Sequence, residues 1–425
     1  MKFRILFLLS SLLVCLSLSA CGPSAAEQAV TATQQAAYDF ATQTALAPTA
    51  TATPTLTATP THTPTITLTP TITPSPTITR TPTPTSTPFG MSRYGNPFVA
   101  FTAWSDQGAS VYGTNLDEEP FSYYAVSIDS NPAIMPVWSP NGSQIAFLHY
   151  DRNRDRFNFV VYDVFRGEVS QTSQHPMDFR SSFCWTYDMQ YLVWSDVQPD
   201  GTELDVYRLD VETDELVNLT QDSPVWNAFP ACSPVSDQIA FVSDRAEGNM
   251  ENDNIWVMDS QGENLRQLTN TPGWENKFPA WSADGTQIAY YHIGFGRMSD
   301  AAYAPAGVYV MNADGSENRL LVENDQLFSS VVEAPHWSPD GRCLAYPVGR
   351  DDTTIYVVST EDGALVWQSS LPGENKELSW SANSAYLLFT NELDDVSQVY
   401  ITDISDPKSV PMLPYPDCFL AAFSP

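Results

Sequence analysis

Carboxylates are the side chains in this chain most able to do chemistry. Its 425 residues include 50 Asp and Glu but only 19 Lys and Arg. A pair of carboxylates can cleave a glycosidic bond, but the distance between two carboxylates cannot be read from a sequence. A hydrolase or lyase that acts on extracellular peptide or glycan through acidic residues therefore stays open as an alternative.

Other catalytic signatures are absent from the sequence. It contains neither the Gly-x-Ser-x-Gly nucleophile motif nor the His-Glu-x-x-His metal motif. The histidines do not share a position in the repeats described below; they are His62, His149, His175, His292 and His336. We therefore predict no catalytic residues, no zinc site and no cofactor.

The charge balance bears on the class of partner. The formal net charge is −31 at pH 7, which argues against nucleic acid because a phosphate-binding surface must be basic. The same charge permits basic partners or cations, or only raises solubility. We expect a protein, peptide or glycan partner and no nucleic acid.

One short segment resembles the start of a calcium loop. Asp151, Asn153 and Asp155 place oxygen-bearing side chains at alternate positions, as the first ligands of an EF-hand do. Arg156 stands where such a loop needs glycine, and Tyr162 stands where it needs a bidentate glutamate. A solvated loop tip is the simpler interpretation, and calcium binding stays open.

Aromatic and amide residues recur in the segments that lead into successive repeats. Glu-Asn-Lys occurs at the same distance before Trp281 and before Trp380, and Trp-Asn precedes Cys232. Exposed aromatic side chains among carboxylates and amides are typical of recognition surfaces. The candidate ligand-binding residues are Trp226, Asn227, Trp274, Glu275, Asn276, Glu374, Asn375 and, in the longest insertion, Phe295. The alternative is that the aromatic members only fill gaps between repeats.

The elements that must position these residues form a repeated β-hairpin. The first clear copy spans residues 136–147 and reads Pro-Val-Trp-Ser-Pro-Asn-Gly-Ser-Gln-Ile-Ala-Phe. Pro140 presets φ in a type I turn, Asn141 suits the next position, and Gly142 accepts a positive φ where the return strand begins. Further copies begin at Trp281 and Trp337, and degraded copies begin at Trp185, Cys232 and Trp380, with Met189, Ser236 and Ser384 in the glycine position.

These repeats predict an all-β fold, a seven-bladed β-propeller of four-stranded blades. The first-strand positions are Trp138, Trp185, Cys232, Trp281, Trp337, Trp380 and Phe423. Residues 96–101 match the second half of the hairpin and residues 418–425 match its first half. We expect residues 419–423 to pair with residues 98–101, because this pairing closes the ring and removes exposed sheet edges.

The repeats resemble the TolB-like β-propeller, which is of WD40-like type. The resemblance covers roughly residues 95–425 and rests on Pro-x-Trp-Ser-Pro-Asp/Asn-Gly-x-x-Ile/Leu-Ala-Phe/Tyr followed by Ile/Val-Tyr/Trp-Val-Met. It implies the fold and says less about function. TolB proteins are periplasmic and carry an α/β domain before the propeller, whereas a Thr/Pro-rich segment stands there in this chain. Similar repeats form the gating propeller of dipeptidyl-peptidase-type hydrolases, but we expect no hydrolase domain after the last strand.

The N-terminal region predicts export and anchoring. Residues 1–20 have the basic start and apolar run of a lipoprotein signal peptide, and Leu-Ser-Ala before Cys21 resembles a bacterial lipobox. The alternative is an ordinary signal peptide with a chance cysteine. Residues 21–44 form the mature N-terminal segment. Residues 45–88 are rich in Thr and Pro, which favours a disordered linker over a sheet.

Four cysteines remain in the region of the repeats, namely Cys184, Cys232, Cys343 and Cys418. An extracytoplasmic location permits disulfides, but no closely spaced pair is present. Cys232 stands where other repeats have Trp, so we expect a buried thiol there. The disulfide state of all four stays open.

Together these features predict a propeller over residues 90–425 that is lipid-anchored to a bacterial membrane through Cys21. We expect a monomeric, non-catalytic scaffold that binds a protein, peptide or glycan at the loop face of the propeller. The identity of the ligand, the glycosylation of the stalk, and the choice between inner and outer membrane are not readable from the sequence.

Overall fold

The computed structural model describes residues 96–425 with short gaps. The gaps are residues 106–107, 119–122, 128–130, 178–181, 199–202, 222–224, 246–252, 295–304, 330–332, 351 and 412–416. The predictions for the signal peptide, Cys21, the segment 21–44 and the linker 45–88 lie outside the described residues, as does the candidate Phe295.

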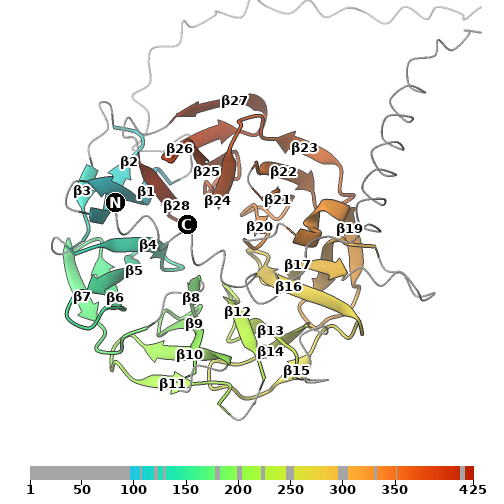
Figure 1. The fold of residues 1–425 in the computed structure, drawn as a ribbon, viewed down its shortest axis with the longest axis horizontal. Coiled ribbons are helices and arrows are strands. Elements are labelled where there is room, and N and C mark those ends of the chain that lie inside the picture. The colour runs from blue at the N-terminus through green and yellow to red at the C-terminus, as the bar shows by residue number, and fades with distance from the viewer. Residues whose placement is uncertain are drawn as a thin grey trace, which may run out of the picture. The chain divides into compact units, whose positions relative to one another are not determined.

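The described strands form seven four-stranded antiparallel sheets arranged as blades around an axis (Figure 1). The first strand of each repeat lies nearest the axis and the fourth lies at the periphery. This arrangement confirms the predicted seven-bladed propeller.

The strands of the first four blades follow one another along the chain. Blade 1 consists of β4 (Ala133–Trp138), β5 (Gln144–Asp151), β6 (Arg156–Asp163) and β7 (Glu168–Thr172). Blade 2 consists of β8 (Phe183–Trp185), β9 (Tyr191–Val197), β10 (Leu204–Asp210) and β11 (Leu216–Asn218). Blade 3 consists of β12 (Asn227–Cys232), β13 (Ile239–Ser243), β14 (Asn254–Met258) and β15 (Arg266–Gln267). Blade 4 consists of β16 (Trp274–Trp281), β17 (Gln287–Gly294), β18 (Gly307–Asn312) and β19 (Arg319–Glu323), and a 3-10 helix η1 (Asp325–Ser329) follows it.

The last three blades include the one that joins the chain ends. Blade 5 consists of β20 (His336–Trp337), β21 (Cys343–Val348), β22 (Thr354–Ser359) and β23 (Leu365–Gln368). Blade 6 consists of β24 (Glu374–Trp380), β25 (Tyr386–Leu393), β26 (Val396–Asp403) and β27 (Asp406–Pro411). Blade 7 consists of β28 (Cys418–Phe423), β1 (Phe98–Ser105), β2 (Gly108–Asn115) and β3 (Tyr123–Ala125).

Blade 7 closes the ring as the sequence predicts. Strand β28 pairs antiparallel with β1, with Val99 opposite Phe423 and Ala103 opposite Cys418. Phe423 keeps only 5% of its surface exposed and Val99 keeps none. The two ends of the described chain therefore complete one sheet that neither fragment could form alone.

The hairpin turns have the conformation that their residues indicate. The Ser139 hydroxyl accepts the backbone N–H of Gln144, and the Asn141 carboxamide oxygen accepts that of Ser143. Gly142 has a φ of 69°, and in the degraded copies Met189 (63°) and Ser384 (62°) hold the same left-handed conformation despite their side chains. The turn geometry therefore survives loss of the glycine in these two copies.

The core lies between neighbouring blades. Leu148 and Phe159 of blade 1, for example, pack in one buried cluster with Trp185 and Trp194 of blade 2. The ring centroids of Phe159 and Trp194 are 4.9 Å apart in an edge-to-face arrangement. Such packing is what the apolar alternation along the strands requires, because each sheet buries both of its faces.

A hydrogen bond at the innermost strand links almost every blade to the one before it. The indole N–H of the first-strand tryptophan donates to the carbonyl oxygen of the residue just before the equivalent position in the preceding blade. The pairs are Trp138–Ala422, Trp185–Val137, Trp281–Ala231, Trp337–Ala280 and Trp380–His336, at 3.0 to 3.2 Å. Phe423 lacks an indole, and its backbone N–H donates instead to the Ser379 hydroxyl at 3.0 Å.

The remaining joint, between blades 2 and 3, is covalent. Cys232, which occupies the tryptophan position, forms a disulfide with Cys184, the residue just before Trp185. The expected buried thiol at Cys232 is therefore wrong, because the ring brings two cysteines 48 positions apart to a Cα–Cα distance of 5.8 Å. Cys343 and Cys418 are free.

Candidate functional site

Successive connections in an antiparallel blade lie on opposite sides of the propeller. We call the side with the segments between blades, and with the connections from second to third strands, the loop face. The opposite side, with the tight hairpin turns, is the turn face. Trp226, Trp274 and Glu374 lie at the start of innermost strands, on the loop face.

The three candidate asparagines are fully buried. Asn227, Asn276 and Asn375 occupy the same position in blades 3, 4 and 6, and none has exposed surface. The Asn276 carboxamide donates to the Asp253 carbonyl at 3.1 Å and to the Thr271 hydroxyl at 2.6 Å. These side chains thus hold the incoming segment to the preceding blade.

A side chain on the second strand of the blade forms a hydrogen bond with the carboxamide oxygen of each asparagine. Ser243 donates to the Asn227 oxygen at 2.8 Å, and Asn391 donates to the Asn375 oxygen at 3.0 Å. In blade 4 the partner is Nδ1 of His292, 2.8 Å from the Asn276 oxygen. Burial lowers the pKa of His292 to about 4, so its imidazole is neutral and carries its proton on Nδ1.

The glutamates of the recurring Glu-Asn-Lys are paired within their own blades. In blade 4, Lys277 lies 2.5 Å from Glu275 and 3.5 Å from Asp253. In blade 6 the equivalent lysine, Lys376, lies 2.7 Å from Glu374 and 2.9 Å from Glu392. The repeated motif therefore builds an ion pair next to the buried asparagine.

The two candidate tryptophans, Trp226 and Trp274, are packed but partly exposed. Trp226 meets Phe229 edge to face at 5.4 Å between ring centroids, and Phe229 lies 4.2 Å from Phe278. Trp274 stacks on the buried His292 at 4.6 Å with 16° between the planes. Both indoles are thus held by the protein while part of each remains available on the loop face.

Two buried aspartates follow β13 and precede β14, and the first of them, Asp244, accepts the backbone N–H of Trp226. Asp244 and Asp253 are 4% and 3% exposed, and one carboxylate oxygen of each, Oδ1, has no hydrogen-bond partner. Burial raises the pKa of Asp253 to about 7; Lys277 opposes this shift, and Glu275 and Asp244 add to it. The sequence carries no signal for this burial.

A second acidic group consists of Glu333, three residues before β20 in blade 5, and Glu377 on β24 in blade 6. Glu333 accepts the backbone N–H groups of Glu377 and Leu378 at 2.7 and 2.8 Å, and Nε2 of His336 lies 2.8 Å away. Glu377 accepts the backbone N–H of Leu420 at 2.6 Å. No sequence signal marks this group, because Glu333 and Glu377 resemble ordinary polar residues until the ring brings neighbouring blades together.

These backbone donors are available because the innermost strands bulge at a shared position. Three residues before the tryptophan position, a residue other than glycine adopts a positive φ and the pairing register shifts. The residues are Met135 (57°), Phe229 (52°), Phe278 (55°), Glu377 (60°) and Leu420 (49°). At two of these bulges the freed N–H meets a carboxylate of the preceding blade.

The pKa values of the two carboxylates in this group are shifted in opposite directions. Burial would raise the pKa of Glu333, but His336 and the two backbone donors outweigh it and hold that pKa below its usual range. Burial raises the pKa of Glu377 to about 7, since Lys376 opposes the shift only in part and Glu333 adds to it. Near neutral pH, Glu333 is ionised and Glu377 is partly protonated.

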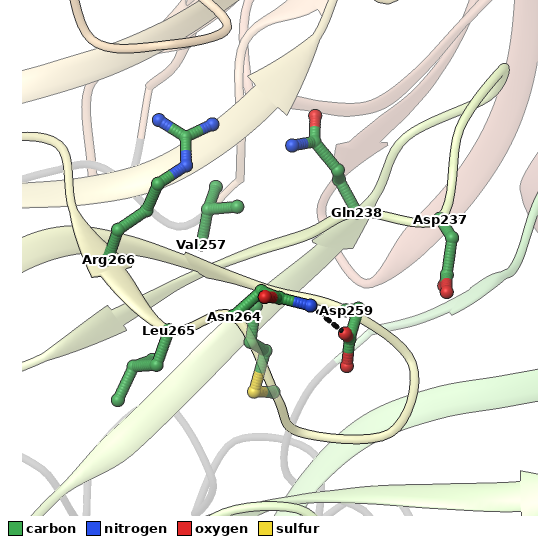
Figure 2. A pocket seen from close by; sticks show the side chains of 8 residues that line it. Asp237, Gln238, Val257, Asp259, Asn264, Leu265 and Arg266 are labelled. Atoms are coloured by element: carbon green, nitrogen blue, oxygen red, sulfur yellow. Dashed lines mark hydrogen bonds between the residues drawn. The ribbon is translucent and has the colours of Figure 1, made fainter.

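A shallow hollow of about 490 Å³ lies elsewhere, on the turn face of blade 3 (Figure 2). Its polar lining consists of Asp237, Gln238, Asp259, Asn264 and Arg266. Asn264 donates to Asp259 at 2.7 Å, and Arg266 donates to the Ala313 carbonyl at 2.9 Å. Asn264, Asp259 and Arg266 thus stabilise the β14–β15 turn and the contact with blade 4.

The calcium-like segment forms the exposed turn between β5 and β6. Asp151 accepts the backbone N–H of Asn153 at 2.8 Å and lies 3.6 Å from the Arg154 guanidinium, while Tyr150 donates to Asp155. Across the described residues, no three His, Cys, Asp or Glu side chains are grouped to hold a metal ion. No helix in that same part of the chain is long and apolar enough to cross a membrane.

Curated relatives match only segments of the chain. An uncharacterised peptidase, YuxL, of Bacillus subtilis is 30% identical over 120 residues, 28% of this chain and 17% of the relative. The Tol-Pal system protein TolB of Alcanivorax borkumensis is 37% identical over 73 residues, 17% of this chain and 14% of the relative. The matched segments thus span less than a fifth of these relatives.

Solved structures share the fold at low identity. Oligogalacturonate lyase from Vibrio parahaemolyticus superposes with a TM-score of 0.56 at 17% identity, covering 72% of this chain and 86% of the lyase. A prolyl endopeptidase gives a TM-score of 0.55 at 15% identity, covering 76% of this chain and 48% of that enzyme. The sequence matches the family described as TolB beta propeller domain over residues 99–323, more than half of the chain, and the chain therefore belongs to that family.

Proposed function

We propose that this protein is a non-catalytic, monomeric binding module whose loop face takes a protein, peptide or glycan. The supporting observation is the pair of partly exposed tryptophans, Trp226 and Trp274, on a rigid base. Asn227 and Asn276 hold the segments that carry them, and buried carboxylates lie beside them. Rigid aromatic side chains next to polar groups are typical of binding surfaces.

The location forms part of the proposal. A signal peptide in residues 1–20, a lipid on Cys21 and a Thr/Pro-rich tether in residues 45–88 would present the propeller outside the cytoplasm, in the periplasm or at the cell surface. Substituting Cys21→Ala should release the protein from the membrane fraction. Unchanged, detergent-dependent membrane association of the variant would contradict the lipid anchor.

The binding experiment compares full-length protein with Trp226→Ala/Trp274→Ala on peptide and glycan arrays. The matched control is Phe165→Ala/Tyr187→Ala, because these aromatic residues are exposed (84% and 42%) in hairpin turns on the turn face. We expect the loop-face variant to lose affinity by about 30-fold, the scale of a binding hot spot of ~2 kcal/mol. Binding that survives the loop-face variant but disappears in the control would place the ligand on the turn face and contradict the proposal.

A second candidate function rests on Glu333 and Glu377. Two carboxylates whose surroundings separate their pKa values are the usual arrangement for a general base and a general acid. In this alternative Glu333 would accept a proton from a peptide or glycan substrate and Glu377 would donate one. Robust turnover in a substrate screen, abolished by Glu377→Gln, would replace the non-catalytic proposal.

A further inference from the structure

Among the described residues at the loop face of blades 2 to 4, carboxylates outnumber the cations near them. Asp205, Asp244, Asp253 and Glu275 are all buried, with 0%, 4%, 3% and 6% of their surface exposed. Asp205 is well satisfied, because it accepts hydrogen bonds from the Asn218, Thr220 and Asn227 side chains. The positive groups that act on the other three are Arg245 and Lys277.

Both of these cations are already engaged. Arg245 donates to the Asn227 carboxamide at 2.7 Å and to the Ser243 hydroxyl at 3.0 Å. Lys277 lies closest to Glu275, at 2.5 Å, and meets only one oxygen of Asp253, at 3.5 Å. The Oδ1 atoms of Asp244 and Asp253 are therefore left without a donor, although Asp244 is stabilised by the backbone N–H of Trp226.

Unpartnered carboxylate oxygens in a buried position are costly unless a donor reaches them. A ligand that brings both hydrogen-bond donors and positive charge would relieve this cost, because the two aspartates also repel each other. Among the described residues, no three carboxylates, cysteines or histidines are grouped to hold a metal ion. An ammonium or guanidinium group meets both requirements, and indole faces attract such cations.

We propose that Asp244 and Asp253 receive the side chain of a lysine or arginine in a peptide ligand, with Trp226 beside it. The inference rests on the proposed binding function and names the ligand class. The net charge of −31 favours the encounter with a basic segment. Asp244 directly follows β13 and Asp253 directly precedes β14, so both lie at the loop-face ends of these strands, from which the ligand would approach.

The experiment selects binders to the full-length protein from a random-peptide phage library. Bound peptides are sequenced, and the best one is made with its basic residue intact or replaced by norleucine, which keeps the apolar stem and removes the charge. Both peptides are titrated against the wild type and against Asp244→Asn/Asp253→Asn. The control variant, Glu263→Gln/Glu361→Gln, removes the same charge from exposed turns on the turn face.

We expect selected peptides to be enriched in Lys and Arg. Norleucine should weaken binding to the wild type by about 30-fold and to the aspartate variant by much less, because the two changes remove the same contact. The control variant should respond as the wild type does. Affinity for the basic peptide should also rise with pH from about 6 to about 8, because Asp253 becomes ionised in this range. The charged groups that act on Asp253 are Lys277, Glu275 and Asp244.

Two outcomes would overturn the inference separately from the function. Peptides or glycans that depend on Trp226 and Trp274 but show no basic enrichment would refute the cation site and leave the binding function standing. An equal norleucine effect in the wild type and the aspartate variant would place the basic residue elsewhere. If no ligand of either class depends on the tryptophans, the proposed function itself fails. Equal unfolding midpoints of all variants show that the comparison concerns binding.

Discussion

The Cys184–Cys232 disulfide replaces an interblade hydrogen bond, so its removal should weaken the ring at one joint. The bond links positions 48 residues apart. For a loop of this length, the chain-entropy relation gives a stabilisation of about 4 kcal/mol at 25 °C. An indole hydrogen bond at another joint contributes about 1 kcal/mol. Cys184→Ala/Cys232→Ala should therefore lower the free energy of unfolding by several times the effect of losing one indole bond.

Urea unfolding followed by tryptophan fluorescence measures the effect. The oxidised wild type is compared with the double alanine variant and with the wild type under reductant. Cys343→Ala serves as the control, because this cysteine is free and half-buried. A repair variant, Cys184→Ala/Cys232→Trp, restores the tryptophan of the other blades, whose indole N–H should reach the carbonyl of residue 184. It should recover part of the lost stability.

The reasoning fails if the oxidised wild type and the double alanine variant unfold at the same urea concentration. That result would mean that interblade packing alone holds the joint between blades 2 and 3. A repair variant less stable than the double alanine variant would show that this joint differs in geometry from the other joints. A loss of stability in the Cys343→Ala control as large as in the double variant would point to a general sensitivity of the core.

Three further predictions concern closure, the buried asparagines and pH. Deleting residues 417–425 removes β28, and loss of buried phenylalanines at about 3 to 5 kcal/mol each is comparable to a whole domain's stability; thermal unfolding with an unchanged midpoint would show that β28 closes nothing. Asn276→Ala removes several buried hydrogen bonds and should cost about 2 to 4 kcal/mol in urea unfolding, whereas a neutral result would mean that the incoming segment is held by other contacts. Burial raises the pKa of Glu377 from 4.5 to about 7 in the folded protein, so the folded state binds more protons in this range and stability falls as pH rises from about 4.5 to about 7. Glu377→Gln should flatten that slope in urea midpoints measured across pH, and an unaltered slope would assign it to another group.

The sequence alone was sufficient for the propeller, the number of blades and the closure by the chain ends. These features follow from local chemistry, because turns such as Pro140-Asn141-Gly142 and the alternation along each strand act within a few residues. Repetition then amplifies a weak signal, and two half-repeats at the ends can only complement each other. Met189 and Ser384 adopt the left-handed conformation of the glycine they replace, so the turn is retained in these copies although its most recognisable residue is absent.

Tertiary structure decided the chemistry of the candidate sites. The sequence repeats an asparagine as a recognition motif would, at Asn227, Asn276 and Asn375. In the ring all three are buried and form hydrogen bonds between blades. A residue that recurs in a repeat protein can either bind a ligand or hold neighbouring blades together. Only the position of the neighbouring blade distinguishes these two roles.

Contacts between blades were likewise unreadable from the sequence. Cys184 meets Cys232, and Glu333 meets the backbone of Glu377, at separations set by the repeat length and not by any local motif. Burial of a carboxylate, and with it the direction of its pKa, depends on every element packed against it. For that reason the unpartnered oxygens of Asp244 and Asp253 became visible only in the closed ring.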